Sequence, residues 1–381
     1  MHKLRKALCP LMCTMFFFFF FSACAGIPQQ KPGIYRSPMN EIFAQQKEIT
    51  VPARQVEHGE DYVIEWQDPV MEKHVRNWLN RPKGEIYHSD VWDYQLVTVS
   101  SGNNPTDTII KNASEGENLG DDFSYDSNEL YKANACKASG DYAPLASLAD
   151  LRHFDSLQVL KIFNEKEAPP ISDLTGLEEC KNLTYLELPS VESSAFPTFA
   201  KLDSVVKLFY GSNIVRADVN VSDLSAFAQM KSLEVLWISG SEVDLSQLAG
   251  ANLRALTLDV TRVESLEPLK ELPNLQALQI EETEVPSFEP LTECSKLQYL
   301  DMGLSLGARE RYRDMDYTPL ARMPQLVLLN LMNHASVDSE LCKQILAGDT
   351  NLKYLDVSYT KVGKEKTELD TSQLEIFIDA T

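Results

Sequence analysis

The sequence predicts an α/β solenoid: a horseshoe with a parallel β-sheet on its concave face, short helical or 3-10 returns, and an N-terminal helical cap. Two observations predict the solenoid. An L-x-x-L-x-L frame occurs nine times, and successive copies start 20 to 29 residues apart, with 22 as the most frequent interval. Between the copies, apolar residues recur every three positions. A third observation, an amphipathic segment ahead of the copies, predicts the cap.

Each repeat contains one strand and one return. In "LEVLWISGSEV", which starts at Leu233, apolar residues in the fourth and sixth places alternate with other residues, as a half-buried strand requires. The return "LEPLKELPN" carries Leu266, Leu269 and Leu272 at intervals of three, which is the period of a 3-10 turn with one apolar side. One coil cannot cover its own apolar side, so the coils must stack.

These repeats resemble the leucine-rich repeat family, and the 22-residue interval with "L-x-P-L-x-x-L-x-x-L" returns is most similar to its internalin-like bacterial subclass. The resemblance covers roughly residues 142 to 381 and implies a solenoid that binds a partner and catalyses nothing. One position departs from the family pattern: Ser241, Thr261, Thr283 and Thr360 stand where the family usually has asparagine. A hydroxyl has one donor where the asparagine amide has two, so we expect a less complete ladder of bonds between coils.

Residues 62 to 99 precede the repeats and predict the helical cap and a first, degenerate repeat. Asp68 and Pro69 are the residue types preferred at an N-cap and at the first helical position, and an apolar stripe follows them. The helix should end near Pro82-Lys83-Gly84, after which "EIYHSDVWDYQLVTV" is expected to form the first coil. The segment resembles the N-terminal cap of bacterial leucine-rich repeat proteins. The alternative is an aromatic ligand platform made of Trp66, Trp78 and Trp92.

Residues 1 to 23 follow the plan of an export signal peptide: basic residues, an apolar stretch with six consecutive phenylalanines, and then small residues. The residues before Cys24 are similar to the lipobox of bacterial lipoproteins, although Phe21 stands where leucine is usual. This resemblance implies a diacylglyceryl group on Cys24. The same stretch also fits ordinary secretory cleavage after Ala25. Both patterns predict export, and we favour a lipoprotein anchored at the cell membrane over a secreted protein. Residues 24 to 61 would form its tether.

The formal net charge is −21 at pH 7, and removal of the signal peptide would deepen it to −24, because three basic residues and no acids would leave. Such a surface repels phosphate backbones and anionic lipid headgroups. We therefore expect no nucleic-acid partner, and contact with a membrane only through a lipid anchor at Cys24. Residues 100 to 141 are expected to form a long, polar, acidic insertion between the first coil and the rest.

The mature chain contains no H-E-x-x-H, P-loop, G-x-G-x-x-G or C-x-x-C motif. The histidines are scattered, and we expect each to be a surface or packing residue. Cys180 and Cys294 occupy equivalent places in two returns that lie about five coils apart, too far for a disulfide. We therefore predict no enzyme activity, no cofactor and no metal site.

Binding residues should lie on the concave face, because the third, fifth and seventh residues of L-x-x-L-x-L-x point away from the core. Four neighbouring coils hold aromatic residues in these places, and later coils hold a tyrosine and several acids. The aromatic half would supply anchors, and the acidic half would steer a basic protein or peptide. The predicted partner-binding residues are Phe163, Tyr185, Phe209, Trp237, Asp259, Glu281, Tyr299 and Asp301.

The sequence leaves the nature of the ligand open. A carbohydrate or cell-wall polymer suits aromatic and acidic side chains as well as a protein does, and a structural stalk would have no ligand. The insertion at residues 100 to 141 could make the contact in place of the concave face. The oligomeric state is equally open.

Overall fold

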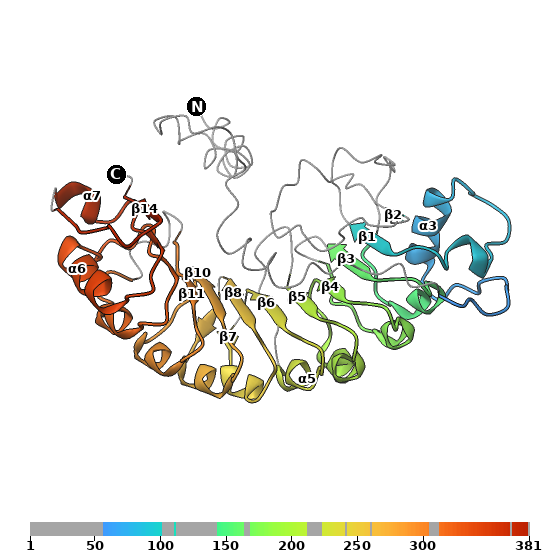
Figure 1. The fold of residues 1–381 in the computed structure, drawn as a ribbon. Helices are drawn as coiled ribbons and strands as arrows, with labels where there is room; N and C mark the ends of the chain where they lie inside the picture. The colour runs from blue at the N-terminus through green and yellow to red at the C-terminus, as the bar shows by residue number, and fades with distance from the viewer. Residues whose placement is uncertain are drawn as a thin grey trace, which may run out of the picture.

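The computed structural model of the chain is a curved solenoid, with strands along the concave side and short helices along the outer side (Figure 1). The structure describes residues 56 to 100, 110 to 111, 143 to 163, 168 to 211, 223 to 240, 242 to 259, 261 to 304, 312 to 365 and 368 to 379. The predicted signal peptide, Cys24 and most of the predicted tether and insertion lie outside these residues.

Twelve strands form one sheet, in the order β14-β13-β12-β11-β10-β8-β6-β5-β4-β3-β1-β2. Every neighbouring pair is parallel except β1 with β2. The strands are β1 (Leu96–Ser100), β2 (Ile110–Lys111), β3 (Val159–Phe163), β4 (Tyr185–Leu188), β5 (Lys207–Tyr210), β6 (Val235–Ser239), β8 (Ala255–Asp259), β10 (Ala277–Glu281), β11 (Tyr299–Asp301), β12 (Leu328–Asn330), β13 (Tyr354–Asp356) and β14 (Ile376–Ile378). Two short strands, β7 (Glu242–Val243) and β9 (Arg262–Val263), pair separately.

The register of this sheet aligns equivalent places of successive repeats. Leu160, Leu186, Leu208, Leu236 and Leu256, all in the fourth place, are consecutive partners in the ladder. Each is at most 1% exposed, and each such burial contributes roughly 1.5–3 kcal/mol of transfer free energy, which is an upper estimate. The parallel sheet and its single continuous core confirm the predicted solenoid.

The returns are short helices that link the repeats along the outer side. They are η2 (Ala149–His153), η3 (Thr175–Glu179), η4 (Ser193–Lys201), α5 (Ser225–Ala228), η5 (Leu245–Leu248), η6 (Glu267–Glu271), η7 (Glu289–Glu293), η9 (Thr318–Arg322), α6 (Ser339–Gly348) and α7 (Val362–Glu365).

The apolar period of three corresponds to 3-10 hydrogen bonds. In and around η6, the amide of Leu269 donates to the carbonyl of Leu266 at 3.0 Å, Leu272 to Leu269 at 3.1 Å, and Leu275 to Leu272 at 3.2 Å. Each leucine of this return is therefore bonded to the next, and all four face the core. A proline lies in the first turn of η6, η7 and η9, where no intrahelical N–H is required.

The helix α3 (Pro69–Trp78) covers the N-terminal end of the solenoid, and η1 (His88–Asp90) follows it. The carboxylate of Asp68 accepts hydrogen bonds from Val70 N at 2.7 Å and from Ser147 N at 3.1 Å, so it caps the helix and contacts the first full coil. Asp150, which is fully buried, accepts a bond from Asp68 N at 2.8 Å. Two carboxylates thus join the cap to the coils, and Trp66 and Trp78 pack against the core.

At the position where the family usually has asparagine, hydroxyl groups make part of the predicted ladder of hydrogen bonds between coils. Thr283 Oγ1 donates to the carbonyl of Leu258 in the preceding repeat at 2.7 Å and contacts Thr261 Oγ1 at 3.2 Å. Thr360 Oγ1 instead donates to Val357 O, within its own repeat. Ser241 lies outside the described residues.

The same position in the repeat that contains β12 is occupied by His334, a residue type outside the serine and threonine pattern of the other repeats. Its Nε2 lies 2.6 Å from the carbonyl oxygen of Met302 in the preceding repeat, and its Nδ1 lies 2.5 Å from Tyr317 Oη. Since a carbonyl only accepts, Nε2 must carry the proton and Nδ1 must accept from the phenol. Burial lowers the pKa of His334 to about 4, so the ring is neutral in this role.

We expect Thr283→Val to lower the free energy of unfolding by about 1–2 kcal/mol, because the buried bond to Leu258 O is lost while the side-chain volume is nearly kept. Denaturant unfolding measures this change. Thr292→Val is the matched control, since Thr292 Oγ1 donates to Glu289 O at a solvent-exposed position, and it should cost less than about 0.5 kcal/mol. An equal loss in both variants would contradict a ladder role for Thr283.

Asp349 is a second buried polar group, located where α6 ends. Its side chain is fully buried, and its Oδ1 accepts a hydrogen bond from Met323 N at 3.1 Å. Within the part of the chain that the structure describes, its Oδ2 has no hydrogen-bond partner. Burial raises the pKa of Asp349 from 3.8 to about 7. The folded state therefore holds a proton that the unfolded state releases above pH 4, so this group contributes stability at low pH that is lost as pH rises towards 7.

Replacing Asp349 with Asn should remove this pH dependence. Relative to the wild-type chain, Asp349→Asn should gain roughly 2–3 kcal/mol in the free energy of unfolding between pH 5 and pH 8. Denaturant unfolding at both pH values measures the difference. A stability difference between variant and wild type that stays constant from pH 5 to pH 8 would show that Asp349 does not titrate in this way.

Candidate functional site

The concave face of the sheet carries two rows of side chains in register. The third-place row consists of Leu96, Val159, Tyr185, Lys207, Val235, Ala255, Ala277, Tyr299, Leu328, Tyr354 and Ile376. The fifth-place row consists of Thr98, Lys161, Glu187, Phe209, Trp237, Thr257, Gln279, Asp301, Asn330, Asp356 and Ile378. The ladder therefore determines which predicted site residues are neighbours.

Three of the four predicted aromatic residues form one cluster on β4, β5 and β6. The rings of Tyr185 and Phe209 stack with centroids 5.2 Å apart, and Phe209 meets Trp237 edge to face at 5.1 Å. The ammonium of Lys161 lies 5.1 Å from the Tyr185 ring centroid, in cation–π geometry. We call Lys161, Tyr185, Phe209 and Trp237 the aromatic cluster. Phe163, at the end of β3, is half-buried and lies outside this cluster.

The aromatic cluster is less exposed than the sequence predicts. Tyr185 and Phe209 are each only 6% exposed, because they pack on one another and on Val159. Trp237 is half-buried, and its Nε1 has no hydrogen-bond acceptor among the residues that the structure describes. The expectation of four exposed anchors is therefore wrong for Tyr185 and Phe209, and Trp237 is the accessible ring of the cluster.

The predicted acids do not form one line. Asp259 and Glu281 are ladder partners in the seventh place, where Asp259 Oδ2 accepts a bond from Ser239 Oγ at 3.2 Å; the side chain of Glu281 lies outside the described part of the chain. Asp301 belongs to the fifth-place row instead, beside Asn330 and Asp356.

In that row, Asn330 Nδ2 donates to Asp301 Oδ1 at 2.8 Å. Gly303 N also donates to Asp301 Oδ1, at 3.1 Å, and Ser358 N donates to Asp356 Oδ1 at 2.8 Å. Burial raises the pKa of both carboxyls, and the charge of Asp356 raises that of Asp301 further. Asn330 and Asp356 were not among the predicted site residues, although their fifth place in the repeat frame could have identified them.

Tyr299 occupies the third place of β11, one row away from Asp301. It is half-buried and packs against Val235, Ala255 and Ala277, and this burial raises its pKa. The small side chains of the two alanines leave the centre of the third-place row low, between larger residues on either side. We call Asp301, Asn330 and Asp356, which lie in the neighbouring fifth-place row, the polar half of the concave face.

Three histidines that are scattered along the sequence come together where the cap meets the first full coil. His58 and His88 both contact the carboxylate of Asp155, and the ring centroids of His88 and His153 lie 6.3 Å apart. The first two are 30 residues apart and the third lies beyond the predicted insertion, so no local spacing in the sequence indicates this cluster.

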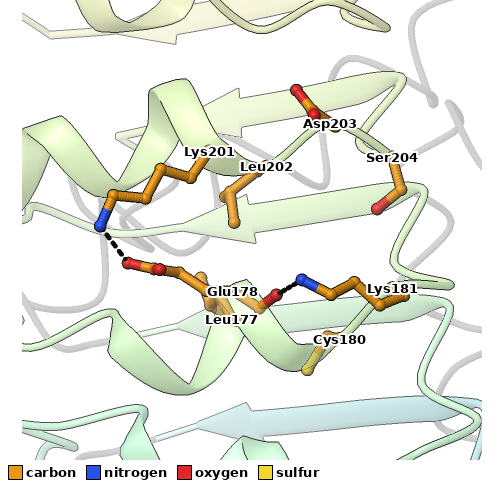
Figure 2. A pocket seen from close by; sticks show the side chains of 8 residues that line it. All are labelled: Leu177, Glu178, Cys180, Lys181, Lys201, Leu202, Asp203 and Ser204. Atoms are coloured by element: carbon orange, nitrogen blue, oxygen red, sulfur yellow. Dashed lines mark hydrogen bonds and ion pairs between the residues drawn. The ribbon is translucent and has the colours of Figure 1, made fainter.

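A small depression lies on the return side, between η3 and η4 (Figure 2). Glu178 forms an ion pair with Lys201 at 2.8 Å, and its backbone carbonyl accepts a bond from Lys181. Burial raises the pKa of the Cys180 thiol to about 12, so this sulfur remains a thiol at neutral pH. The depression lies away from the concave face and offers no reactive nucleophile.

In the described ranges, no group of three or more His, Cys, Asp or Glu side chains is arranged to hold a metal ion. Within the same ranges, the helices are too short or too polar to cross a membrane. The predicted lipidation site, Cys24, lies outside these residues.

No protein-family model matches the chain, and no curated protein matches it. Among solved structures, an internalin of Listeria monocytogenes is 17% identical and covers 83% of this chain and 96% of its own, with a TM-score of 0.46. Internalin C2 from the same organism is 19% identical, with coverages of 82% and 93% and a TM-score of 0.36. A leucine-rich repeat protein of Leptospira interrogans is 18% identical, with coverages of 54% and 50% and a TM-score of 0.40.

These identities and TM-scores are low, so the fold assignment rests on the chain's own repeats. Each L-x-x-L-x-L frame from Leu157 onwards contributes one parallel strand, and the frames align place by place. The chain is therefore a leucine-rich repeat solenoid with an N-terminal helical cap.

Proposed function

We propose that this chain is a non-catalytic, exported leucine-rich repeat protein that binds a protein or peptide ligand through its concave face. One observation carries the proposal: an aromatic cluster on β4 to β6 and a carboxylate-rich row on β11 to β13 lie on the same face, in register. A solenoid presents such a face to a partner as a continuous, curved surface.

The aromatic cluster would contribute one main anchor. Trp237 is partly accessible, and Phe209 holds it from the side, so a partner would meet a large ring that has already lost much of its freedom. Tryptophan is also among the residue types most enriched at interface hot spots.

The polar half would select for a basic partner. Asp301 and Asp356 lie two strands apart in one row, and burial disfavours the charge of each. A cationic group on the ligand would relieve that cost, and the net charge of −21 would speed its approach. Each carboxylate already accepts a bond from a backbone N–H two residues further along, which suits a recognition surface better than a proton-transfer site.

We expect Trp237→Ala to weaken binding of the natural partner at least about tenfold, because it removes the accessible anchor. The partner would be captured from an envelope extract with the immobilised wild-type chain and identified by mass spectrometry, and its affinity for each variant would then be measured. Phe209→Ala is a poor test, since a buried core ring would be lost with it.

Tyr87→Ala is the matched control, because Tyr87 is an aromatic residue on the cap that is 40% exposed. It should leave the affinity unchanged. If Trp237→Ala binds an identified partner as tightly as the wild type does, the proposal that the concave face binds the ligand is wrong. Binding to glycans that is lost in Trp237→Ala, with no protein captured, would indicate a carbohydrate ligand instead.

We further propose that the chain is held at the cell membrane through a lipid on Cys24. The motif before Cys24 supports this proposal, together with the residues up to position 61 that would serve as the tether. Mass spectrometry of the mature N-terminus tests it. A diacylglyceryl-modified Cys24 is the expected result, and a free N-terminus at Gly26 would indicate secretion without an anchor.

A further inference from the structure

The segment that leads into the cap is bound to the first coil through His58. Further along, Tyr62 O accepts a bond from His88 N, and Ile64 N donates to Ile86 O, both at 2.8 Å. Val63 and Tyr87 form an isolated antiparallel bridge in the same place. His58 lies N-terminal to these backbone bonds and adds side-chain contacts of its own to Asp155 and Asp93.

His58 lies between two carboxylates. Its Nδ1 is 3.0 Å from Asp155 Oδ2, and its Nε2 is 3.0 Å from Asp93 Oδ1. An ionised carboxylate only accepts hydrogen bonds, and a neutral imidazole has only one N–H. Both contacts are therefore hydrogen bonds only when both ring nitrogens carry protons. In the neutral ring, one nitrogen lone pair would face a carboxylate oxygen.

The neighbouring histidines differ from His58 in this respect. His88 Nε2 lies 3.1 Å from Asp155 Oδ1, but its Nδ1 is buried without a hydrogen-bond partner in the described residues, so protonation would create an unpaired buried donor. His153 Nδ1 contacts Tyr62 Oη at 2.7 Å, and burial lowers the pKa of His153 to about 4. His58 is thus the one histidine of this cluster whose contacts require the charged ring.

The surroundings of His58 also favour a cation. Its ring stacks on Trp92 with centroids 4.3 Å apart and an angle of 12° between the planes. A charged ring over an indole face is attracted by the aromatic quadrupole. Trp92 Nε1 in turn donates to Asp93 Oδ2 at 3.2 Å, which holds that carboxylate in place.

The charged and titratable groups around the site come from three elements. They are Asp93 and His88 from the cap, Asp155, Arg152 and His153 from the first full coil, and Asp61 and Tyr62 from the segment itself. Asp93 and Asp155 contact His58 directly, whereas the Nε of Arg152 donates to the carbonyl of Ala149. The two nearest charges are therefore both negative, and the side chains of His58 and Asp155 are only 20% and 22% exposed.

We propose that His58 is a protonation-dependent latch that holds residues 56 to 61 on the first coil. In its charged form it joins Asp93 and Asp155, and both bonds are present. When pH rises and the ring loses a proton, one contact becomes repulsive and the attachment of the segment weakens, while Asp61 still accepts bonds from Ser89 N and Ser89 Oγ. The latch thus closes in acid and opens as pH rises, and histidine is the side chain whose charge changes between about pH 5 and pH 8. This inference does not depend on the ligand of the concave face.

Nuclear magnetic resonance of the imidazole nitrogens in the full-length chain tests the protonation state. At pH 5.5 both ring nitrogens of His58 should have the shifts of N–H groups, while His153 should show one protonated nitrogen. At pH 8.5 His58 should also show only one. A neutral His58 ring at pH 5.5 would overturn the proposal.

Amide hydrogen exchange tests whether the latch holds the segment. After correction for the intrinsic rate, protection of the Ile64 amide should fall about five- to tenfold between pH 5.5 and pH 8.5, since the charge-assisted bonds lost amount to about 1–1.4 kcal/mol. In His58→Gln the protection should be low and independent of pH, whereas His153→Gln should keep the pH dependence. The same pH dependence in wild type and His58→Gln would overturn the latch.

Discussion

The rest of the structure depends on one constraint: a coil cannot bury its own leucines, so every coil must adopt the register of its neighbours. The row of fourth-place leucines satisfies this constraint. A slip of one residue on β5 would expose Leu208 and place Phe209 in the core position. Because the leucines fix the register, they also fix every other place in the frame. The leucine register therefore fixes where the third-, fifth- and seventh-place residues lie on the concave face. It does not constrain which side chains occupy these places.

The fixed spacing of these places determines which aromatic and polar side chains contact one another. Neighbouring strands lie about 4.8 Å apart, close to the 5.1 Å between the ring centroids of the ladder partners Phe209 and Trp237. Tyr185 lies in the third-place row and reaches Phe209 diagonally, with a centroid distance of 5.2 Å. Aromatic residues on successive strands thus bury one another, and the last ring of the series keeps the most exposure. Carboxylates in a row cannot pack in this way. Asp301 and Asp356 bond to backbone amides of their own repeats and lie on either side of Asn330.

Local periodicity predicts most of this fold, because the strand frame and the 3-10 returns are both encoded within one repeat, as Leu266, Leu269 and Leu272 illustrate. It also places residues on the concave face. It does not predict exposure, which depends on ring contacts between different coils, so it gives no sign that Tyr185 is only 6% exposed. The contact between His58 and Asp155 spans 97 residues and has no local signal at all. The role of His334 could be predicted only in part. The repeat frame identifies its position between the coils, but a histidine at this position departs from the family pattern.

His334 and Asp349 show how such buried groups affect the stability of the C-terminal repeats. Burial lowers the pKa of His334 from 6.5 to about 4, so stability from this group is lost as pH falls through that interval. Burial raises the pKa of Asp349 from 3.8 to about 7, so stability from this group is lost as pH rises through nearly the same interval. The two slopes have opposite signs and similar size, and they largely cancel between pH 4 and pH 6.5. A flat pH profile of the wild-type chain would thus be consistent with two strongly perturbed groups, and substitution of either one separates their contributions.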